Sequence, residues 1–350
     1  MRAVRIHGER DVRLENLPEP TIEPGTVLLT GGFTGICGTD LHLYFKPESL
    51  GEDFSSPATL TGATWPQILG HEFSGEVSHL GSDVGHLGVG DRVAVFPYHY
   101  CGNCLACRSD QYTSCEFMAF EGIHGHSGGM AQVKRVRADD CFVLPPSVDL
   151  KLGALVEPMA VGWHGVSLAA VHDGDSALIV GGGPIGVGVY FALKARGVPR
   201  VIVSEPSADR RAVLERIGVD HVIDPTAIDL NGEVRALTGG GGVAAAIDTA
   251  GAPRAFAGAM ESLGIGGRMI IIAVYEEPIE LHRSLLFGGR SIQNSSVYSR
   301  EDYRAVIAAM SSGLYSGASQ WIETVSFEQV ENALHELRAG KGLKMLVETP

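Results

Sequence analysis

The chain has 350 residues, of which 45% are hydrophobic and 19% charged, and 27 Lys and Arg stand against 41 Asp and Glu. This composition indicates a globular protein long enough for two domains, and the formal net charge of −14 argues against a nucleic-acid partner. The N-terminus lacks an apolar stretch of the length that a secretory peptide needs, so we expect a cytoplasmic protein.

The first 100 residues or so alternate short apolar runs with Gly, Pro and Asp turns, as in Val27–Leu29 and Gly90–Val95. This pattern is typical of a β-rich, barrel-like domain. The polar stretch from Lys46 to Pro66 predicts a long loop, which is either a plain surface excursion or a lip over an active site.

Two short motifs in this region, Gly35–His42 and Gly70–Phe73, contain residues that can do chemistry. Together with Glu157 they offer a thiolate from Cys37 and an imidazole from His71. Three such ligands leave the fourth position of a zinc ion open, as in catalytic sites. Each residue alone is more often a core or surface group, and spacing cannot join three distant segments. The residues by themselves leave both interpretations open.

Four clustered cysteines follow with the spacing C-x₂-C-x₂-C-x₇-C: Cys101, Cys104, Cys107 and Cys115. Four thiolates complete a tetrahedral zinc ion and leave no place for substrate, which predicts a structural zinc lobe at about residues 97–120. An iron–sulfur cluster uses the same ligands, but its characteristic spacing and a second cysteine set are missing from the sequence.

Three further residues have side chains of a type that can bind metal. His124 and His126 lie in a glycine-rich segment, where we expect a solvated position or a pocket edge. Cys141 has no partner in the cysteine pattern and is expected in the core.

A helix is expected from Met159 to Val171, close to a domain boundary near Leu152. Pro158 is well suited to the first helical position, which would leave Glu157 at the helix entrance.

The apolar run Ala177–Val180, the glycine-rich Gly181–Gly186 and the apolar segment that ends at Leu193 predict a buried strand, a tight turn and a helix. This loop has the spacing of a dinucleotide-binding fingerprint, with free helix amides for the pyrophosphate. A membrane span would also be uncharged, but five glycines and a proline favour the strand, turn and helix. The expected nucleotide contacts are Gly181, Gly183, Pro184, Ile185 and Gly186.

An acid, Glu205, ends the next predicted strand, roughly 20 residues past the glycines. It can accept hydrogen bonds from a ribose 2′-hydroxyl and would repel a 2′-phosphate, which favours NAD over NADP. Arg210 and Arg211 leave NADP open, because an arginine there can hold a phosphate. Further strands and helices predict a doubly wound sheet: strands at 221–224, 245–248 and 268–274, and helices at 209–218 and 253–263. Gly239–Gly242 is expected to be a flexible turn.

These motifs together resemble the zinc-dependent medium-chain dehydrogenase/reductase family, most closely its 2,3-butanediol and sorbitol dehydrogenase branch. The similarity covers the chain from Met1 to the C-terminus. It implies an α/β plus β fold, in which a GroES-like catalytic domain (1–152) is interrupted by a Rossmann doubly wound parallel-sheet domain (153–295). Residues 296–350 would return to the first domain.

The resemblance also implies roles for single residues. The catalytic zinc ligands would be Cys37, His71, Glu157 and, in place of water or Glu157, Glu72. Thr39 would contact the substrate hydroxyl, and His42 would relay its proton to solvent through the nicotinamide ribose. The adenosine and nicotinamide would be bordered by Thr249, Ala250, Ala273, Val274, Ser295 and Ser296, with Lys344 and Arg210 as further contacts.

The implied activity is the reversible oxidation of a secondary alcohol to a ketone, with NAD and two zinc ions per chain. Zinc would lower the pKa of the alcohol, and hydride would pass to the nicotinamide. The branch favours a vicinal diol and acyloin pair such as 2,3-butanediol and acetoin. Polyols such as sorbitol, simpler secondary alcohols and, more distantly, L-threonine remain open. A zinc-poor protein that only binds NAD(H) is the alternative from another class, against which the three candidate ligands argue.

The partners implied are a small-molecule alcohol or ketone and further copies of the chain, in a homodimer or homotetramer. The apolar segment Met269–Val274 would lie in the part of the sheet that pairs across the dimer. Neither nucleic acid nor a membrane is expected as a partner.

Overall fold

The computed structural model describes residues 1–125 and 127–350 and divides into two compact units. The first unit comprises Met1–Glu157, Tyr303–Ser311 and Trp321–Pro350, and the second comprises Pro158–Asp302 and Ser312–Gln320. A β-rich domain interrupted by a doubly wound parallel domain is therefore confirmed as the fold.

The chain crosses between the units four times, after residues 157, 302, 311 and 320, whereas the sequence suggested two crossings, after residues 152 and 295. The second crossing has a clear physical cause. Within the second unit, the Asp302 carboxylate lies 2.8 Å from Nδ1 of His164. The next residue, Tyr303, donates its hydroxyl to the carbonyl of Val95 in the first unit at 2.6 Å.

The predicted helix start at Pro158 is wrong. Helix α3 spans Leu150–Ala169 and contains Pro158 in its interior. Asp149 fixes the earlier start, because its carboxylate accepts a hydrogen bond from the Leu152 amide at 2.8 Å. The residues around the proline are fully buried, and this burial offsets the helix hydrogen bond that proline removes. Glu157 therefore lies in mid-helix.

The first unit is built on one large sheet and two smaller ones. The large sheet runs β10-β3-β6-β4-β19-β18, with β7 on β6 and β11 on β7, and the smaller sheets are β2-β1-β5 and β8-β9. The strands are β1 (Arg2–Gly8), β2 (Asp11–Asn16), β3 (Thr26–Thr30), β4 (Phe33–Gly35), β5 (Gln67–Ile68), β6 (Glu72–Leu80), β7 (Arg92–Val95), β8 (Tyr98–His99), β9 (Ala119–Phe120), β10 (Val133–Arg137), β11 (Cys141–Val143), β18 (Ile322–Val325) and β19 (Lys344–Glu348).

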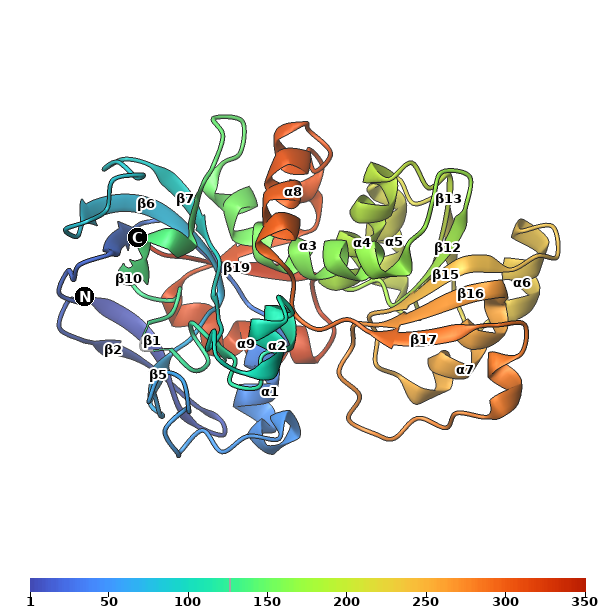
Figure 1. The fold of residues 1–350 in the computed structure, drawn as a ribbon, viewed down its shortest axis with the longest axis horizontal. Coiled ribbons are helices and arrows are strands. Elements are labelled where there is room, and N and C mark those ends of the chain that lie inside the picture. The colour runs from blue at the N-terminus through green and yellow to red at the C-terminus, as the bar shows by residue number, and fades with distance from the viewer. Residues whose placement is uncertain (126) are drawn as a thin grey trace. The chain divides into compact units, whose positions relative to one another are not determined.

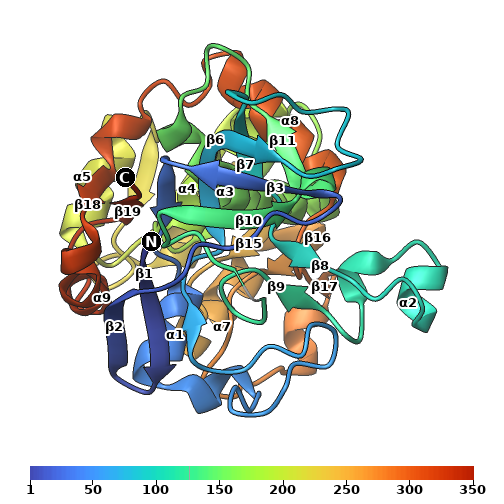
Figure 2. The ribbon, with the colours of Figure 1, turned by 90° about the vertical axis from the view of Figure 1, so that its left-hand side faces the viewer.

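Alternating apolar residues build the core of this unit, as the sequence pattern predicted. Alternate side chains of three strands meet in one cluster, which includes Val27, Leu29, Phe73, Val77, Val93 and Val95. The helices with residues in this unit, besides α3, are α1 (Gly38–Phe45), α2 (Leu105–Arg108), α8 (Arg300–Ser311) and α9 (Val330–Arg338). The segment that carries α2 projects from the strands of the unit (Figure 2).

Lys134 on β10 is fully buried, and no ion pair with a carboxylate is found for it among the residues that the structure describes. Its ammonium donates to the carbonyl of Gly31 at 2.6 Å and to the hydroxyl of Thr349 at 2.9 Å. Burial disfavours the charge and lowers the pKa of Lys134 to about 7.

We expect this lysine to make the protein more stable as the pH rises from 7 to 9. The folded state loses its proton near pH 7, whereas the unfolded chain keeps it to about pH 10.4, so the unfolded state binds more protons in between. The slope of about 1.4 kcal/mol per pH unit predicts a gain of about 2–3 kcal/mol over two units. Thermal unfolding of the wild type and of Lys134→Met at pH 7 and at pH 9 isolates the contribution of Lys134 to the pH dependence of stability. Equal pH dependence of the two proteins would contradict the prediction.

The second unit is a six-stranded parallel sheet in the order β14-β13-β12-β15-β16-β17. Successive strands run outward from β12 in one direction and then in the other, which defines a doubly wound fold with its switch point between β12 and β15. The elements are β12 (Ser176–Val180), α4 (Pro184–Ala195), β13 (Arg200–Ser204), α5 (Ala208–Arg216), β14 (His221–Ile223), α6 (Leu230–Leu237), β15 (Val243–Asp248), α7 (Pro253–Ser262), β16 (Leu263–Ile271) and β17 (Ser291–Asn294).

Helices cover both faces of this sheet. Figure 1 shows α4 and α5 on one side of the strands and α7 on the other, and α6 packs against α7. The segment for which a membrane span was the alternative forms β12, the glycine loop and α4. Among the described residues, no helix combines the length and the apolar character needed to cross a membrane.

The sequence extended the fifth strand too far, to Val274. Strand β16 ends at Ile271, because the amides of Ile272 and Ala273 both turn back to the carbonyl of Asp248, at 2.9 and 3.1 Å. It is also bonded on both sides, by β15 and β17. The edge strands of this sheet are β14 and β17.

Candidate metal centres and nucleotide-binding loop

The four clustered cysteines converge in the projecting segment of the first unit. Their sulfur atoms all lie within 4.8 Å of one another. The Cys101 and Cys115 sulfurs are 3.6 Å apart, and the Cys104 and Cys115 sulfurs 3.9 Å. Zinc–sulfur bonds of about 2.3 Å in a tetrahedron put sulfurs about 3.8 Å apart, so the residues fit a zinc ion.

Backbone amides in this lobe point at the sulfur atoms. The Cys104 amide donates to the Cys101 sulfur at 3.3 Å, and the Cys107 amide donates to the Cys104 sulfur at 3.5 Å. The Cys107 amide lowers the pKa of Cys104 to about 6. The local backbone thus favours the thiolate form that binds metal.

A second candidate metal group contains Cys37, His71 and Glu72, whose ligand atoms lie within 4.8 Å of one another. Strand pairing explains why residues so far apart in sequence meet. Strands β4 and β6 are antiparallel with Gly35 opposite Glu72, so Cys37, at the start of α1, comes next to the start of β6. Sequence spacing contains no such information.

The electric field at this group favours a cation. Burial disfavours a charge on His71, but the Cys37 sulfur and the carboxylates of Asp40 and Glu157 outweigh it and raise the pKa of His71 to about 10. The same negative groups would stabilise a divalent metal. Nδ1 of His71 lies 3.9 Å from Oδ1 of Asp40 and has no hydrogen-bond partner within the part of the chain that the structure describes.

The carboxylate in the compact group is Glu72 rather than Glu157. Glu157 is buried and close enough to act electrostatically on His71, but it lies outside the set of mutually close ligand atoms. The residues present fit a metal held by Cys37, His71 and an acid. Whether that acid is Glu157, as the resemblance implies, or Glu72 stays a prediction.

Lys344, which the resemblance placed against the nucleotide, has a different environment in the structure. It is only 2% exposed in the first unit, where its ammonium forms an ion pair with Glu72 and donates to the carbonyl of Ile36 at 2.9 Å. Strand β19 puts it there, because Leu346 pairs with Gly35. These contacts lie within the first unit, and a contact of Lys344 with the nucleotide stays a prediction.

Helix α1 carries the two residues that were expected to move a proton. The Thr39 hydroxyl lies 3.8 Å from the Cys37 sulfur. Nδ1 of His42 lies 2.9 Å from the hydroxyl of Ser49, which itself donates to the carbonyl of Lys46 at 2.7 Å. Ser49 therefore accepts from the Nδ1 proton of His42, and Nε2 is left as the basic nitrogen.

The sequence analysis missed two residues of this centre, Asp40 and Ser49. Asp40 is fully buried, and its carboxylate accepts from the Cys37 amide at 2.8 Å in a capping box. An acid three residues after a helix cap is a signal that the sequence does contain. No sequence signal identifies Ser49, because the contact depends on how the chain turns after α1.

The glycine-rich loop of the second unit has the geometry that a dinucleotide needs. Gly181 has φ +97°, and a Cβ on Gly186 would lie 2.1 Å from the carbonyl of Gly181. A Cβ on Gly183 would meet none of the described atoms within 4 Å, so the space in front of this glycine is open. Pro184 begins α4 directly behind it, followed by Ile185.

Glu205 lies at the end of β13 and is 3% exposed. Its carboxylate accepts from the amides of Gly182 and Ser207, both at 2.7 Å. Arg211 is engaged elsewhere, in an ion pair of 2.9 Å with Asp224. Arg210 has a buried Nε without a partner among the residues that the structure describes, and it is the arginine that could contact a nucleotide.

The other residues expected around the nucleotide follow the carboxyl ends of the strands in the second unit, at one edge of its sheet. The Thr249 hydroxyl bonds the carbonyls of Val180 and Gly181 at 2.9 and 3.0 Å, which ties this segment to the glycine loop. The Ser295 amide bonds the carbonyl of Ile271 at 2.8 Å. Near these two lie the remaining members of the predicted set: Ala250, Ala273, Val274 and Ser296.

His124 and Cys141 lie outside both candidate metal groups. Nε2 of His124 is 2.7 Å from the Glu52 carboxylate, and Cys141 is buried on β11. His126 lies outside the described residues.

Two family models match the amino-acid sequence. The alcohol dehydrogenase GroES-like domain matches residues 23–146, and the zinc-binding dehydrogenase domain matches residues 184–312. The chain is 36% identical over 321 residues to the (R,R)-butanediol dehydrogenase of Bacillus subtilis (strain 168), with 90% of each chain covered. It is 34% identical over 274 residues to the sorbitol dehydrogenase of the same strain, with 78% of this chain and 75% of the relative covered.

Solved structures agree with these matches. The crystal structure of 2R,3R-butanediol dehydrogenase from Bacillus subtilis has a TM-score of 0.91 at 33% identity and covers 100% of this chain and 99% of its own. A zinc-binding dehydrogenase of Sinorhizobium meliloti 1021 with NADP has a TM-score of 0.86 at 29% identity, covering 99% and 98%. An alcohol dehydrogenase of Escherichia coli CFT073 with NADH has a TM-score of 0.87 at 26% identity, covering 99% of both.

Proposed function

The chain belongs to the zinc-dependent medium-chain dehydrogenase family, and from that premise we propose that it interconverts a vicinal diol, such as 2,3-butanediol, and the corresponding acyloin with NAD. Membership makes it an alcohol dehydrogenase, an oxidoreductase of CH–OH groups that uses zinc and a nicotinamide cofactor. The substrate, the choice of NAD, the cytoplasmic location and the count of two zinc ions per chain are parts of the proposal.

The observation that carries the proposal is the convergence of the half-buried Cys37 with the buried His71 and Glu72, in a field that raises the pKa of His71 to about 10. Zinc bound there would supply a Lewis acid that lowers the pKa of an alcohol. Three protein ligands leave room for a substrate, whereas the four cysteines of the lobe leave none. A vicinal diol presents two adjacent oxygen atoms to such a centre.

Residues of α1 would remove the proton from the substrate hydroxyl. Thr39 and His42 are three positions apart and share one face of the helix. Thr39 would accept a hydrogen bond from the substrate, and the basic Nε2 of His42 would take the proton toward solvent. The contact with Ser49 favours the tautomer of His42 that carries its proton on Nδ1.

The Glu205→Ala variant is expected to bind NAD about tenfold more weakly and to discriminate less against NADP. The carboxylate would accept ribose hydroxyl bonds and repel a 2′-phosphate, and it also supports the glycine loop through Gly182. KM values for both nucleotides measure the effect. Asp209→Ala, which removes an exposed acid from the first turn of α5, is the control. An unchanged ratio of the two KM values would show that Glu205 does not select the cofactor.

A substrate panel tests the proposed reaction. We expect one stereoisomer of 2,3-butanediol to give the highest kcat/KM, measured by the absorbance of reduced nicotinamide, ahead of sorbitol, simple secondary alcohols and L-threonine. Sorbitol is the second candidate, because the chain is 34% identical to a sorbitol dehydrogenase. Oxidation of none of these, with one zinc ion per chain and normal NADH binding, would support a nucleotide-binding protein instead.

We further propose that the protein is a homodimer or homotetramer. Strand β17 supplies an exposed edge at which a second copy could extend the sheet. Size-exclusion chromatography with light scattering measures the subunit number, and a monomer at micromolar concentration would contradict the proposal.

A further inference from the structure

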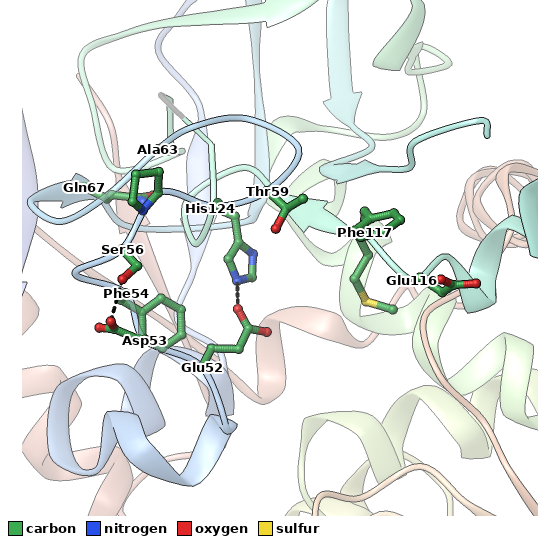
Figure 3. A pocket seen from close by; sticks show the side chains of 13 residues that line it. Glu52, Asp53, Phe54, Ser56, Thr59, Ala63, Gln67, Glu116, Phe117 and His124 are labelled. Carbon is green, nitrogen blue, oxygen red and sulfur yellow. Dashed lines mark hydrogen bonds and ion pairs between the residues drawn. The ribbon is translucent and has the colours of Figure 1, made fainter. Parts of the chain in front are cut away.

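A pocket of about 430 Å³ lies in the first unit, beside the long loop that follows α1. Figure 3 shows the imidazole of His124 between the Glu52–Asp53 turn on one side and Glu116 and Phe117 on the other. The Lys46–Pro66 segment, for which the sequence left a lip or a plain excursion open, therefore supplies one wall of a pocket.

The charged groups along this pocket are almost all acidic. Glu52, Asp53 and Glu116 line it together with His124, and no lysine or arginine is found among the described lining residues. His124 lies 2.7 Å from Glu52 and offsets one charge at most. Asp53 accepts from Ser55 and Ser56, which lower the pKa of this carboxyl and keep it ionised. An anionic ligand would find no counter-charge here.

A separate observation is an unpaired buried acceptor in the lining of the pocket. Gln67 is 6% exposed and lines the pocket, and its Oε1 has no hydrogen-bond partner among residues 1–125 and 127–350. An unpaired buried carbonyl is costly, so a donor on a ligand would gain by reaching it. Nδ1 of His124 is also buried and unpartnered within the described chain. When Nε2 of His124 donates to Glu52, Nδ1 carries no proton and is a second acceptor.

Two contacts connect the pocket to the candidate metal group within the first unit. The His124 amide donates to the Phe120 carbonyl at 2.8 Å, and the Phe120 ring stands edge-on to the metal-group residue His71, with 6.4 Å between ring centres. Ser49, whose hydroxyl contacts Nδ1 of His42, precedes the pocket residue Glu52 by three residues. Three residues span at most about 11 Å. The pocket therefore neighbours both His71 and the relay residue His42.

We propose that this pocket binds the part of a substrate remote from the reacting carbon, and that it selects hydroxyl or ammonium donors and rejects anions. The inference rests on the proposed dehydrogenase function and extends it to a substrate class. An uncharged polyol or an amino polyol would satisfy Gln67 and the carboxylates. A phosphorylated polyol would place its charge against Glu116 and Asp53.

The test compares three ligands by isothermal titration calorimetry on the zinc-loaded full chain with NADH: sorbitol, 1-amino-1-deoxysorbitol and sorbitol 6-phosphate. We expect the phosphate ester to bind at least about tenfold more weakly than sorbitol, because Coulomb repulsion from several carboxylates acts across the pocket. The amino compound should bind at least as tightly as sorbitol. Tighter binding of the amine identifies ammonium as the preferred donor, and equal binding identifies the hydroxyl.

Two variants assign the effect to the pocket. Glu116→Gln removes an exposed charge with little risk to folding. It should reduce the ratio of the dissociation constants of sorbitol 6-phosphate and sorbitol about fivefold. Gln67→Met removes the unpaired acceptor and should weaken the binding of sorbitol about fivefold. Glu19 is an exposed acid that does not line the pocket, and Glu19→Gln should change neither the affinity for sorbitol nor its ratio to that for the phosphate.

Equal affinity for sorbitol and its phosphate, or affinities that Glu116→Gln leaves unchanged, would overturn the inference. Binding of none of the three ligands would overturn it as well. Calorimetry does not depend on turnover, so ligand discrimination without alcohol oxidation would refute the proposed function but support a binding pocket of this chemistry. Oxidation of 2,3-butanediol together with equal affinities for the three ligands would support the proposed function but refute the binding pocket.

Discussion

The Cys37→Ser variant is expected to lose alcohol oxidation by at least about a thousandfold while it stays folded. A serine hydroxyl is a poor replacement for a thiolate as a zinc ligand, and losing a Lewis acid worth several kcal/mol corresponds to a loss of this size. The fold should survive, because Cys37 is the N-cap of α1 and serine is a favoured N-cap residue. Initial rates and zinc content per chain are the measurements.

Cys141→Ser is the matched control, since it makes the same chemical change at a buried cysteine outside both metal groups. We expect Cys37→Ser to retain one zinc ion per chain and the control to retain two. Normal rates in Cys37→Ser would refute the assignment of this residue as a ligand of the catalytic metal.

The Cys104→Ser variant is expected to lose the lobe zinc and to unfold the lobe locally. Zinc bound by four thiolates contributes folding free energy outright, on the order of 10 kcal/mol in small zinc domains. Cys104 is also the N-cap of α2, and its sulfur accepts from the Cys107 amide. Zinc analysis and limited proteolysis between residues 97 and 120 report the change. The chemical step, followed by single-turnover kinetics on folded protein, should change much less.

Ser114→Ala provides the control inside the lobe, because this residue is exposed and is not one of the four cysteines. Its proteolysis pattern should match that of the wild type. If Cys104→Ser kept two zinc ions per chain and resisted protease equally well, the lobe would not be a zinc site.

The site was only partly predictable. The acids and the thiol of the metal group were visible as residue types, but the proximity of Glu72 to Cys37 and His71, within 4.8 Å, follows only from the pairing of β4 with β6. Lys344 illustrates the same limit. Its position in the sequence is at the start of the last strand, and only the pairing of β19 with β4 shows that its partner is Glu72.

The sequence by itself determined those features whose cause is local. Alternating apolar residues specify strands, glycines at Gly181 and Gly186 specify a turn that no side chain fits, and four closely spaced cysteines specify their own metal geometry. The tertiary structure alone decided which distant residues share a site and which groups line the acidic pocket. The physical reason is that strand register and helix packing are set by contacts between segments far apart in the chain, and local patterns do not encode those contacts.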